Sequence, residues 1–228
     1  YRDWAWEQAG SDELRRSVTA LREVAREEPL GRTLVFGAAA CRLPYELALG
    51  FGATEVVAID IDPFTFVVAE AIVRGRTLRL TEANLGVQDA DHLSRTWTVA
   101  APAGPRATDD FHFVLGNGLA PPFAAGSFDT VVTPWFIDQV PPDAGKFFDT
   151  LARLVRPGGR WLNQGPLLYR VDLPLALRHP RQEIFERANA AGFRVDKWAS
   201  ESRPYLVSPL NGRGRIEAVL SFAATRVR

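Results

Sequence analysis

The 228-residue sequence contains no methionine and one cysteine, Cys41. A single cysteine excludes an intrachain disulfide, and no His, Cys, Asp or Glu grouping has metal-ligand spacing, so we predict no metal. The formal net charge is zero, with 27 basic and 27 acidic side chains, which argues against a nucleic-acid partner. No uncharged apolar run reaches about 18 residues, so we expect no membrane partner. These absences favour a protein of the reducing cytoplasm.

The amino-terminal end lacks a signal-peptide pattern and begins at Tyr1 instead of methionine. We therefore expect further chain upstream, such as an initiator, a tag or a fused domain. Within the given sequence we predict an N-terminal helical lid segment over residues 1–30 and one α/β domain over residues 31–228.

Strand-like and helix-like segments alternate along most of the chain, after a first helix at 11–28. Residues 76–110 are predicted to be irregular, and two late strands follow the last helix without a helix between them. Such alternation predicts βαβ units. The expected fold is a doubly wound, mostly parallel sheet with an antiparallel edge pair at the C-terminus. The expected strands are 32–37, 54–60, 111–116, 128–136, 158–165, 193–199 and 215–226, and the later helices 41–52, 62–75, 143–155 and 181–192.

The loop after the first predicted strand is poor in glycine. Gly37 is followed by three alanines and Cys41, where a dinucleotide-binding loop would carry two more glycines so that its backbone could approach a pyrophosphate. Asp60 ends the second strand, 23 residues after Gly37, where a carboxylate can accept hydrogen bonds from ribose hydroxyls. Asp60 could instead cap the next helix, but Asp62, directly before Pro63, already fits that role. The pattern favours an adenosine that carries no phosphate.

Several longer motifs carry a family resemblance. The stretches "VFGAAACR", "VVAIDID", "GNGLAPPFAAGSFDTVV" and "LARLVRPGGRWL" resemble class I S-adenosylmethionine-dependent methyltransferases. "RDWAWE", "VVTPWFID" and "NQGPLLYR" look like the carnosine N-methyltransferase (N2227-like) family. This resemblance implies a Rossmann-like fold, S-adenosylmethionine as cofactor and S-adenosylhomocysteine as product.

The resemblance also implies cofactor contacts. Arg42 would bind the methionine carboxylate, although it could also be a solvated arginine at a helix start. Asp60 would hold the ribose, and Asn117, which stands where the family usually has aspartate, would contact the adenine beside Gly118. The implied cofactor-binding set is Gly37, Ala39, Arg42, Asp60, Asn117, Gly118 and Pro134.

On the acceptor side, Asp138 is the candidate catalytic residue, because a carboxylate bonded to one imidazole N–H fixes the tautomer and stabilises the imidazolium that forms. Capping of a following helix is the alternative, and prolines at 141 and 142 disfavour it. Tyr205 is the second candidate catalytic residue: it matches a substrate-covering tyrosine of the family, though an ordinary buried tyrosine would look the same. Trp135, beside Asp138, is a candidate substrate contact.

Arg170, Arg213 and Arg215 stand where the family has histidine or tyrosine. They suggest a substrate carboxylate, unless the loop at 211–215 is only a solvated loop. The predicted function is N-methylation of a small imidazole- or azole-containing acceptor, such as a histidine derivative or histidine-containing dipeptide. A peptide or protein histidine methyltransferase and an inactive interaction module remain alternatives.

Overall fold

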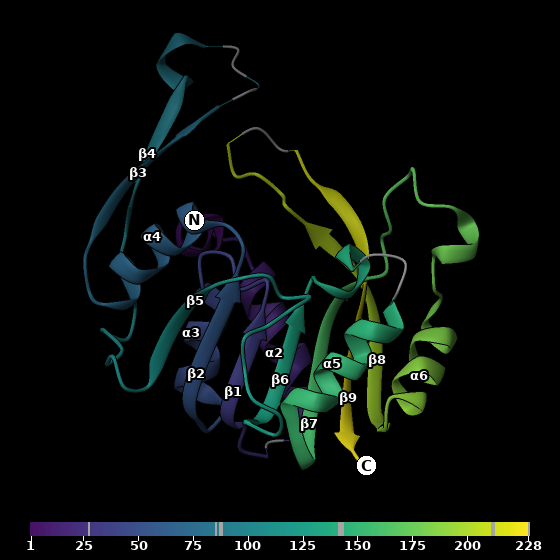
Figure 1. Cartoon of the computed structure of the whole chain (residues 1–228). Coiled ribbons are helices and arrows are strands. Elements are labelled where there is room, and N and C mark those ends of the chain that lie inside the picture. Colours follow the sequence, from purple (N-terminus) through teal and green to yellow (C-terminus); the bar gives the residue numbers. More distant parts are fainter. Residues whose placement is uncertain (27, 85, 87–88, 141–143, 211–212, 228) are drawn as a thin grey trace.

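The computed structural model describes residues 1–26, 28–84, 86, 89–140, 144–210 and 213–227. Its centre is a seven-stranded sheet with the order β5-β2-β1-β6-β7-β9-β8 (Figure 1). Neighbouring strands from β5 to β7 run parallel, whereas β9 runs antiparallel to both β7 and β8. The predicted fold class, including the antiparallel pair at the C-terminus, is confirmed. The strands are β1 (Gly31–Phe36), β2 (Ala53–Asp60), β5 (Phe111–Leu115), β6 (Phe128–Pro134), β7 (Val155–Pro166), β8 (Phe193–Tyr205) and β9 (Arg215–Arg226).

Helices cover both faces of this sheet. One core cluster joins β1 and β2 to α2 (Glu13–Ala25), α3 (Arg42–Gly50) and α4 (Pro63–Val73). The other joins the opposite face to α5 (Ala144–Leu154) and α6 (Arg181–Ala190). The central strands are buried on both sides, which is why they read as near-continuous apolar runs in the sequence. Short turns of 3-10 helix complete the chain at η1 (Trp6–Ala9), η2 (Ala90–His92), η3 (Ile137–Gln139) and η4 (Leu175–Leu177).

The N-terminal segment is part of this core. It begins with the short helix α1 (Arg2–Ala5), and Trp4, Ala5 and Trp6 are all buried in the first core cluster. The α2 helix packs against β7, β8, β9 and α3. The predicted boundary between a lid at 1–30 and the domain at 31–228 stays a prediction.

The prediction of irregular structure at 76–110 is wrong for residues 78–83 and 94–99, whereas residues 100–110 form the expected loop. This region contains an antiparallel ribbon of β3 (Leu78–Ala83) and β4 (Ser94–Val99), which extends away from the main sheet (Figure 1). Only Trp97 and Val99 of the ribbon are buried. The strands do alternate, with Leu78 and Leu80 half-buried and Trp97 and Val99 buried, but each strand is only six residues long and the prediction overlooked the pattern.

The predicted end of the strand that corresponds to β8, at residue 199, is also wrong. The expected strand at 193–199 continues to Tyr205 and pairs with β9 along its whole length. Among the described residues, no helix combines the length and apolar character needed to cross a bilayer.

The loop after β1 has the positive φ angles that are typical of a glycine-rich loop, although Gly37 is its only glycine between residues 37 and 41. Gly37 has φ 56°, Ala39 has φ 46° and Cys41 has φ 58°, so two residues with side chains lie in the left-handed region. Such a residue costs about 1–2 kcal/mol relative to ordinary backbone. The two missing glycines of the sequence therefore correspond to two strained positions.

Replacing Ala39, whose side chain is exposed, by glycine should relieve this strain. We expect Ala39→Gly to raise the free energy of unfolding by about 0.5–1 kcal/mol, measured by urea denaturation. Ala38→Gly is the matched control: Ala38 lies outside the left-handed region, so the added chain entropy should lower stability by about 0.4–1 kcal/mol. Equal destabilisation by both variants would contradict the strain.

Candidate functional site

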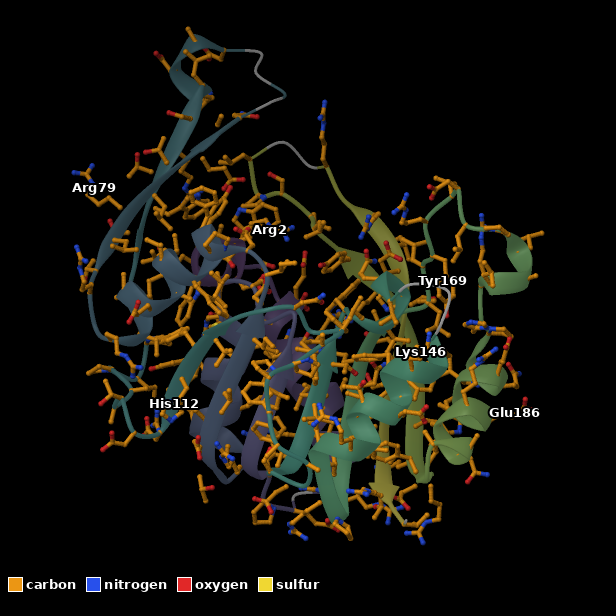
Figure 2. The ribbon with its side chains drawn as sticks, in the orientation of Figure 1. Arg2, Arg79, His112, Lys146, Tyr169 and Glu186 are labelled. Atoms are coloured by element: carbon orange, nitrogen blue, oxygen red, sulfur yellow. The ribbon has the colours of Figure 1, made fainter. Side chains whose placement is uncertain are left out.

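A cavity of about 150 Å³ lies at the carboxyl edge of the parallel strands. Four parts of the chain form its walls: the N-terminal segment with α2, the loop after β1 with the start of α3, the end of β6, and the ends of β7 and β8. Arg2 comes from the first of these and lies above this edge of the sheet (Figure 2). The lining residues are Arg2, Asp3, Glu13, Leu14, Ser17, Gly37, Ala38, Ala39, Arg42, Leu43, Pro44, Pro134, Trp135, Gln164, Arg203 and Tyr205.

Six of the predicted site residues line this one cavity. Gly37, Ala39 and Arg42 come from the loop after β1 and the start of α3, whereas Pro134, Trp135 and Tyr205 come from β6, its end and the end of β8. The parallel arrangement of β1 and β6 explains why segments about 100 residues apart meet.

Asp60 joins the cavity through the loop. Its Oδ2 accepts the Ala39 N–H at 2.8 Å, and its Oδ1 accepts the Asp62 N–H at 2.9 Å. An ionised carboxylate offers about four acceptor positions, so two remain for hydroxyl donors. Asp62 caps α4 by accepting the Phe64 N–H at 2.9 Å. The capping role predicted for Asp62 is confirmed, and ribose binding by Asp60 stays a prediction.

Arg42 is buried and tied to acidic side chains. It pairs with Glu46 on its own helix, and its NH2 lies 2.9 Å from Glu7 Oε2. The guanidinium also lies 4.9 Å from the centre of the Trp4 ring. Arg42 is thus no solvated helix-start arginine: it joins the N-terminal segment to α3. Binding of a methionine carboxylate by Arg42 stays a prediction.

Asn117 and Gly118 follow β5 at the same edge of the sheet. Asn117 is exposed, and its Oδ1 accepts the Leu119 N–H at 2.9 Å, which leaves its NH2 group to donate to a ligand. A Cβ on Gly118 would lie 3.0 Å from Phe136 Cζ and 3.1 Å from Phe36 Cδ1. A larger residue at position 118 would press on these two rings, and the adenine contacts of Asn117 and Gly118 stay predictions.

Trp135 and Tyr205 form a stacked pair in the cavity wall, with ring centres 3.7 Å apart and planes 13° from parallel. Trp135 has a left-handed backbone, φ 52°, and its N–H donates to the Gln164 carbonyl at 2.6 Å. A Cβ on Gly165 would lie 2.8 Å from Trp135 Cα, so this close approach requires glycine. The paired backbones of β6 and β7 thus aim the indole at Tyr205.

A second cavity, of about 260 Å³, lies near this pair. Glu217 lines it and is paired with Arg215, whose guanidinium lies 5.2 Å from the Tyr205 ring centre. The lining residues are Pro166, Leu167, Leu168, Arg181, Ser200, Glu217, Ala218 and Leu220.

Asp138 lies in η3, is 6% exposed, and is hydrogen bonded to the Leu168 N–H beside the second cavity. Its Oδ1 has no hydrogen-bond partner in the described part of the chain. Burial raises the pKa of the Asp138 carboxyl, and the negative charge of Glu217 adds to this, against the hydrogen bonds from Gln139 and Leu168. The capping alternative finds no support, since these partners do not belong to a helix N-terminus. Pro141 and Pro142 lie outside the described residues.

Tyr169 lies close to this carboxylate, above the same edge of the sheet as Arg2 but towards α6 (Figure 2). Its hydroxyl donates to the His179 carbonyl at 2.8 Å. Burial, with the charges of Asp138 and Glu183, raises the pKa of Tyr169 to about 12. Tyr169 therefore stays a neutral hydrogen-bond donor.

The other predicted arginines lie outside the lining of both cavities. Arg170 is exposed and bonds Asp172 through Nε at 3.0 Å and NH2 at 2.5 Å. Arg213 is exposed, and its carbonyl accepts the Ser208 N–H at 2.7 Å; residues 211 and 212 lie outside the described residues. Substrate binding by Arg170, Arg213 and Arg215 stays a prediction, and for Arg170 and Arg215 it would require their ion pairs to open.

The sequence analysis missed several polar residues of the first cavity, chiefly Arg2, Ser17, Gln164 and Arg203. A signal existed for Arg203: it precedes Tyr205 by two residues, so both lie on one face once the strand is known to extend that far. No cluster of three or more His, Cys, Asp or Glu side chains that could hold a metal occurs among the residues described.

Comparisons with known proteins agree with this architecture. Among solved structures, a chain in the complex of the Haloferax volcanii Trm112 methyltransferase activator with a putative methyltransferase has a TM-score of 0.64 at 16% identity, covering 100% of this chain and 91% of that one. An S-adenosylmethionine-dependent methyltransferase from Methanosarcina mazei has a TM-score of 0.60 at 16% identity, covering 88% and 93%. The [4+2]-cyclase SpnF has a TM-score of 0.60 at 11% identity, covering 92% and 80%. These identities show the fold alone.

Sequence comparison is more specific. A carnosine N-methyltransferase from Dictyostelium discoideum is 44% identical over 43 residues, which are 19% of this chain and only 9% of the length of that relative. The family model described as carnosine N-methyltransferase matches residues 84–209, more than half of the chain. The chain belongs to the carnosine N-methyltransferase family, whose members are S-adenosylmethionine-dependent methyltransferases.

Proposed function

We propose that this chain transfers the methyl group of S-adenosylmethionine to a ring nitrogen of a small imidazole-containing acceptor, a histidine derivative or histidine-containing dipeptide. The observation that carries the proposal is the buried Asp138 carboxylate with an unpaired oxygen. A buried polar atom needs a hydrogen-bond partner, and an azole N–H is a donor that would supply one. The family match supports the choice of acceptor class.

The first cavity fits the cofactor in its donor and acceptor groups. Asp60 retains acceptor positions for the ribose hydroxyls, and the loop at Gly37 and Ala39 brings backbone to the cavity wall. Arg2 and Arg203 add positive charge to the walls, which suits a carboxylate. When bound, S-adenosylmethionine supplies a methyl group on a sulfonium sulfur, already activated for attack by a nitrogen lone pair.

The residues of the chain would orient the acceptor so that an unprotonated ring nitrogen faces the methyl group. Asp138 would accept the N–H of the acceptor ring, which leaves the other ring nitrogen unprotonated, and its charge would stabilise the imidazolium that forms. Trp135 and Tyr205 would contact the faces of the planar ring, which requires their stacked rings to separate or to move together.

Mass spectrometry of a metabolite extract treated with enzyme and deuteromethyl-labelled S-adenosylmethionine tests the reaction directly. We expect a labelled product that contains an imidazole. Calorimetry with S-adenosylhomocysteine and NAD tests the cofactor independently. No binding of S-adenosylhomocysteine would contradict the proposed enzyme.

Asp60→Ala should weaken S-adenosylhomocysteine binding by about 1.5–3 kcal/mol, roughly tenfold to 150-fold, because a charge-assisted acceptor for the ribose is lost. Isothermal titration calorimetry measures this. Asp62→Ala is the matched control: it should cost about 1 kcal/mol of stability through the lost cap and leave the affinity unchanged. The reverse behaviour of the two variants would show that the wrong aspartate had been assigned.

Asp138→Asn should lower kcat about a hundredfold to a thousandfold, since one well-placed electrostatic partner is worth about 2.7–4 kcal/mol in a transition state. The dissociation constant for S-adenosylhomocysteine should stay unchanged, because Asp138 does not line the first cavity. Steady-state kinetics on the acceptor found by the labelling assay gives the answer. Near-normal turnover would remove Asp138 from the mechanism.

The same variant has a predicted pH signature. Because burial raises the pKa of Asp138 in the folded protein, the folded state holds its proton more tightly than the unfolded state. The favourable contribution is complete below the unfolded pKa of about 3.9 and is lost as pH rises through the folded pKa. Asp138→Asn should therefore melt at a higher temperature than the wild type at pH 7.5, with the difference shrinking towards pH 4. A lower melting temperature at pH 7.5 would argue for a structural carboxylate.

A further inference from the structure

Arg203 is a buried cation near the end of β8. It is 2% exposed, whereas its neighbours Ser202 and Pro204 are exposed. Its NH2 group donates to Ser17 Oγ at 3.0 Å, and its NH1 group has no hydrogen-bond partner among the described residues. Glu201 and Glu13 interact with the Arg203 guanidinium electrostatically, without a hydrogen bond to it. A guanidinium in this position lacks the close anion that usually accompanies a buried charge.

Three other arginines that were candidates for anion binding are paired with carboxylates, and Arg2, which also lines the first cavity, is only half-buried. Arg42 has two carboxylate partners, Arg170 is paired with Asp172, and Arg215 is paired with Glu217. Arg203 lines the first cavity without such a partner. Because an uncompensated buried charge is costly, its retention is explained if a ligand brings the anion.

Gln164 presents the complementary group in the same wall. Its side chain is fully buried, its Nε2 donates to the Ser17 carbonyl at 2.9 Å, and its Oε1 has no partner in the described part of the chain. Ser17 thus holds both side chains, the guanidinium through its hydroxyl and the amide through its carbonyl. One unsatisfied donor and one unsatisfied acceptor are anchored on a single residue of α2.

We propose that Arg203 and Gln164, anchored by Ser17, form a subsite for an α-amino-acid head group. The guanidinium binds the carboxylate, and Gln164 Oε1 accepts a hydrogen bond from the ammonium. Asp3 and Glu13 also line the cavity and complement the ammonium charge. A phosphate or a simple carboxylate would satisfy the guanidinium but leave the Gln164 oxygen without a donor.

Two ligands carry this head group, if the proposed function holds: the methionine end of the cofactor and an acceptor that is a free histidine derivative, since a histidine within a dipeptide lacks either the ammonium or the α-carboxylate. Calorimetry with matched probes separates them. For the cofactor, S-adenosylhomocysteine is compared with 5′-methylthioadenosine, which lacks the amino acid. For the acceptor, L-histidine is compared with histamine, which lacks the carboxylate, on protein saturated with S-adenosylhomocysteine.

We expect Arg203→Gln to weaken the amino-acid member of one pair by at least about tenfold while leaving its truncated partner unchanged. The pair affected identifies the source of the head group. Arg194→Gln, which removes an exposed arginine of the same strand, is the control and should change neither pair. Equal losses within each pair, or no loss in either, would overturn the subsite.

Failure of the proposed function would look different. If the wild type binds neither S-adenosylhomocysteine nor 5′-methylthioadenosine, the methyltransferase proposal fails, and L-methionine and L-histidine alone then test the subsite. Binding of either that is lost in Arg203→Gln supports it, and no binding of either overturns it.

Thermal denaturation of Arg203→Leu separates a ligand-binding arginine from a structural one. Removing a buried cation that lacks an anion should leave the melting temperature without ligand unchanged or higher, and should reduce the gain on adding the probe identified above. A lower melting temperature with an undiminished gain would show that Arg203 supports the fold, and would overturn the proposal.

Discussion

The first cavity depends on the hydrogen bond from the Trp4 indole to the Ala40 carbonyl, at 2.7 Å. Trp4 is buried, its ring centre lies 5.4 Å from that of Tyr45, and the Arg42 guanidinium packs against it. This contact fixes the N-terminal segment over the loop after β1, 36 residues further along the chain. Arg2 belongs to this segment and lines the cavity, and the Arg42 guanidinium lies on the same indole.

The same segment also stabilises the β3–β4 ribbon. Glu82 Oε2 accepts hydrogen bonds from the indoles of Trp6 at 2.8 Å and Trp97 at 2.9 Å. An isolated two-stranded ribbon is marginally stable at best in water, so a buried tryptophan and a shared carboxylate at its base matter. The N-terminal segment is therefore bonded on one side to the loop of the site and on the other to the ribbon, which makes it a structural part of the cavity.

The sequence predicted the sheet because its central strands are buried on both faces and are separated by amphipathic helices. It predicted the cap at Asp62 because an aspartate directly before a proline is typical of a helix start. It did not predict the ribbon, whose stability comes from a contact between Trp6 and Glu82, 76 positions apart. It predicted the glycine-poor loop but not its left-handed alanine and cysteine, because tertiary contacts such as the Ala39–Asp60 bond hold strain that local preference opposes.

The charged residues of the cavity also divide into those that local sequence predicts and those whose role depends on tertiary contacts. The sequence placed Gly37 and Trp135 near strand ends, and the family resemblance pointed to Tyr205, but neither showed which arginine is left without a close anion. That depends on pairing over long distances in the chain: Glu7 reaches Arg42 across 35 residues, and Ser17 reaches Arg203 across 186. Whether a buried charge can bind a ligand depends on whether the fold leaves it without a partner. In this chain Arg170 and Arg215, which were expected to bind a carboxylate, are paired within the protein. The buried Arg203, whose NH1 group has no partner among the described residues, lies on the strand extension that local periodicity did not predict.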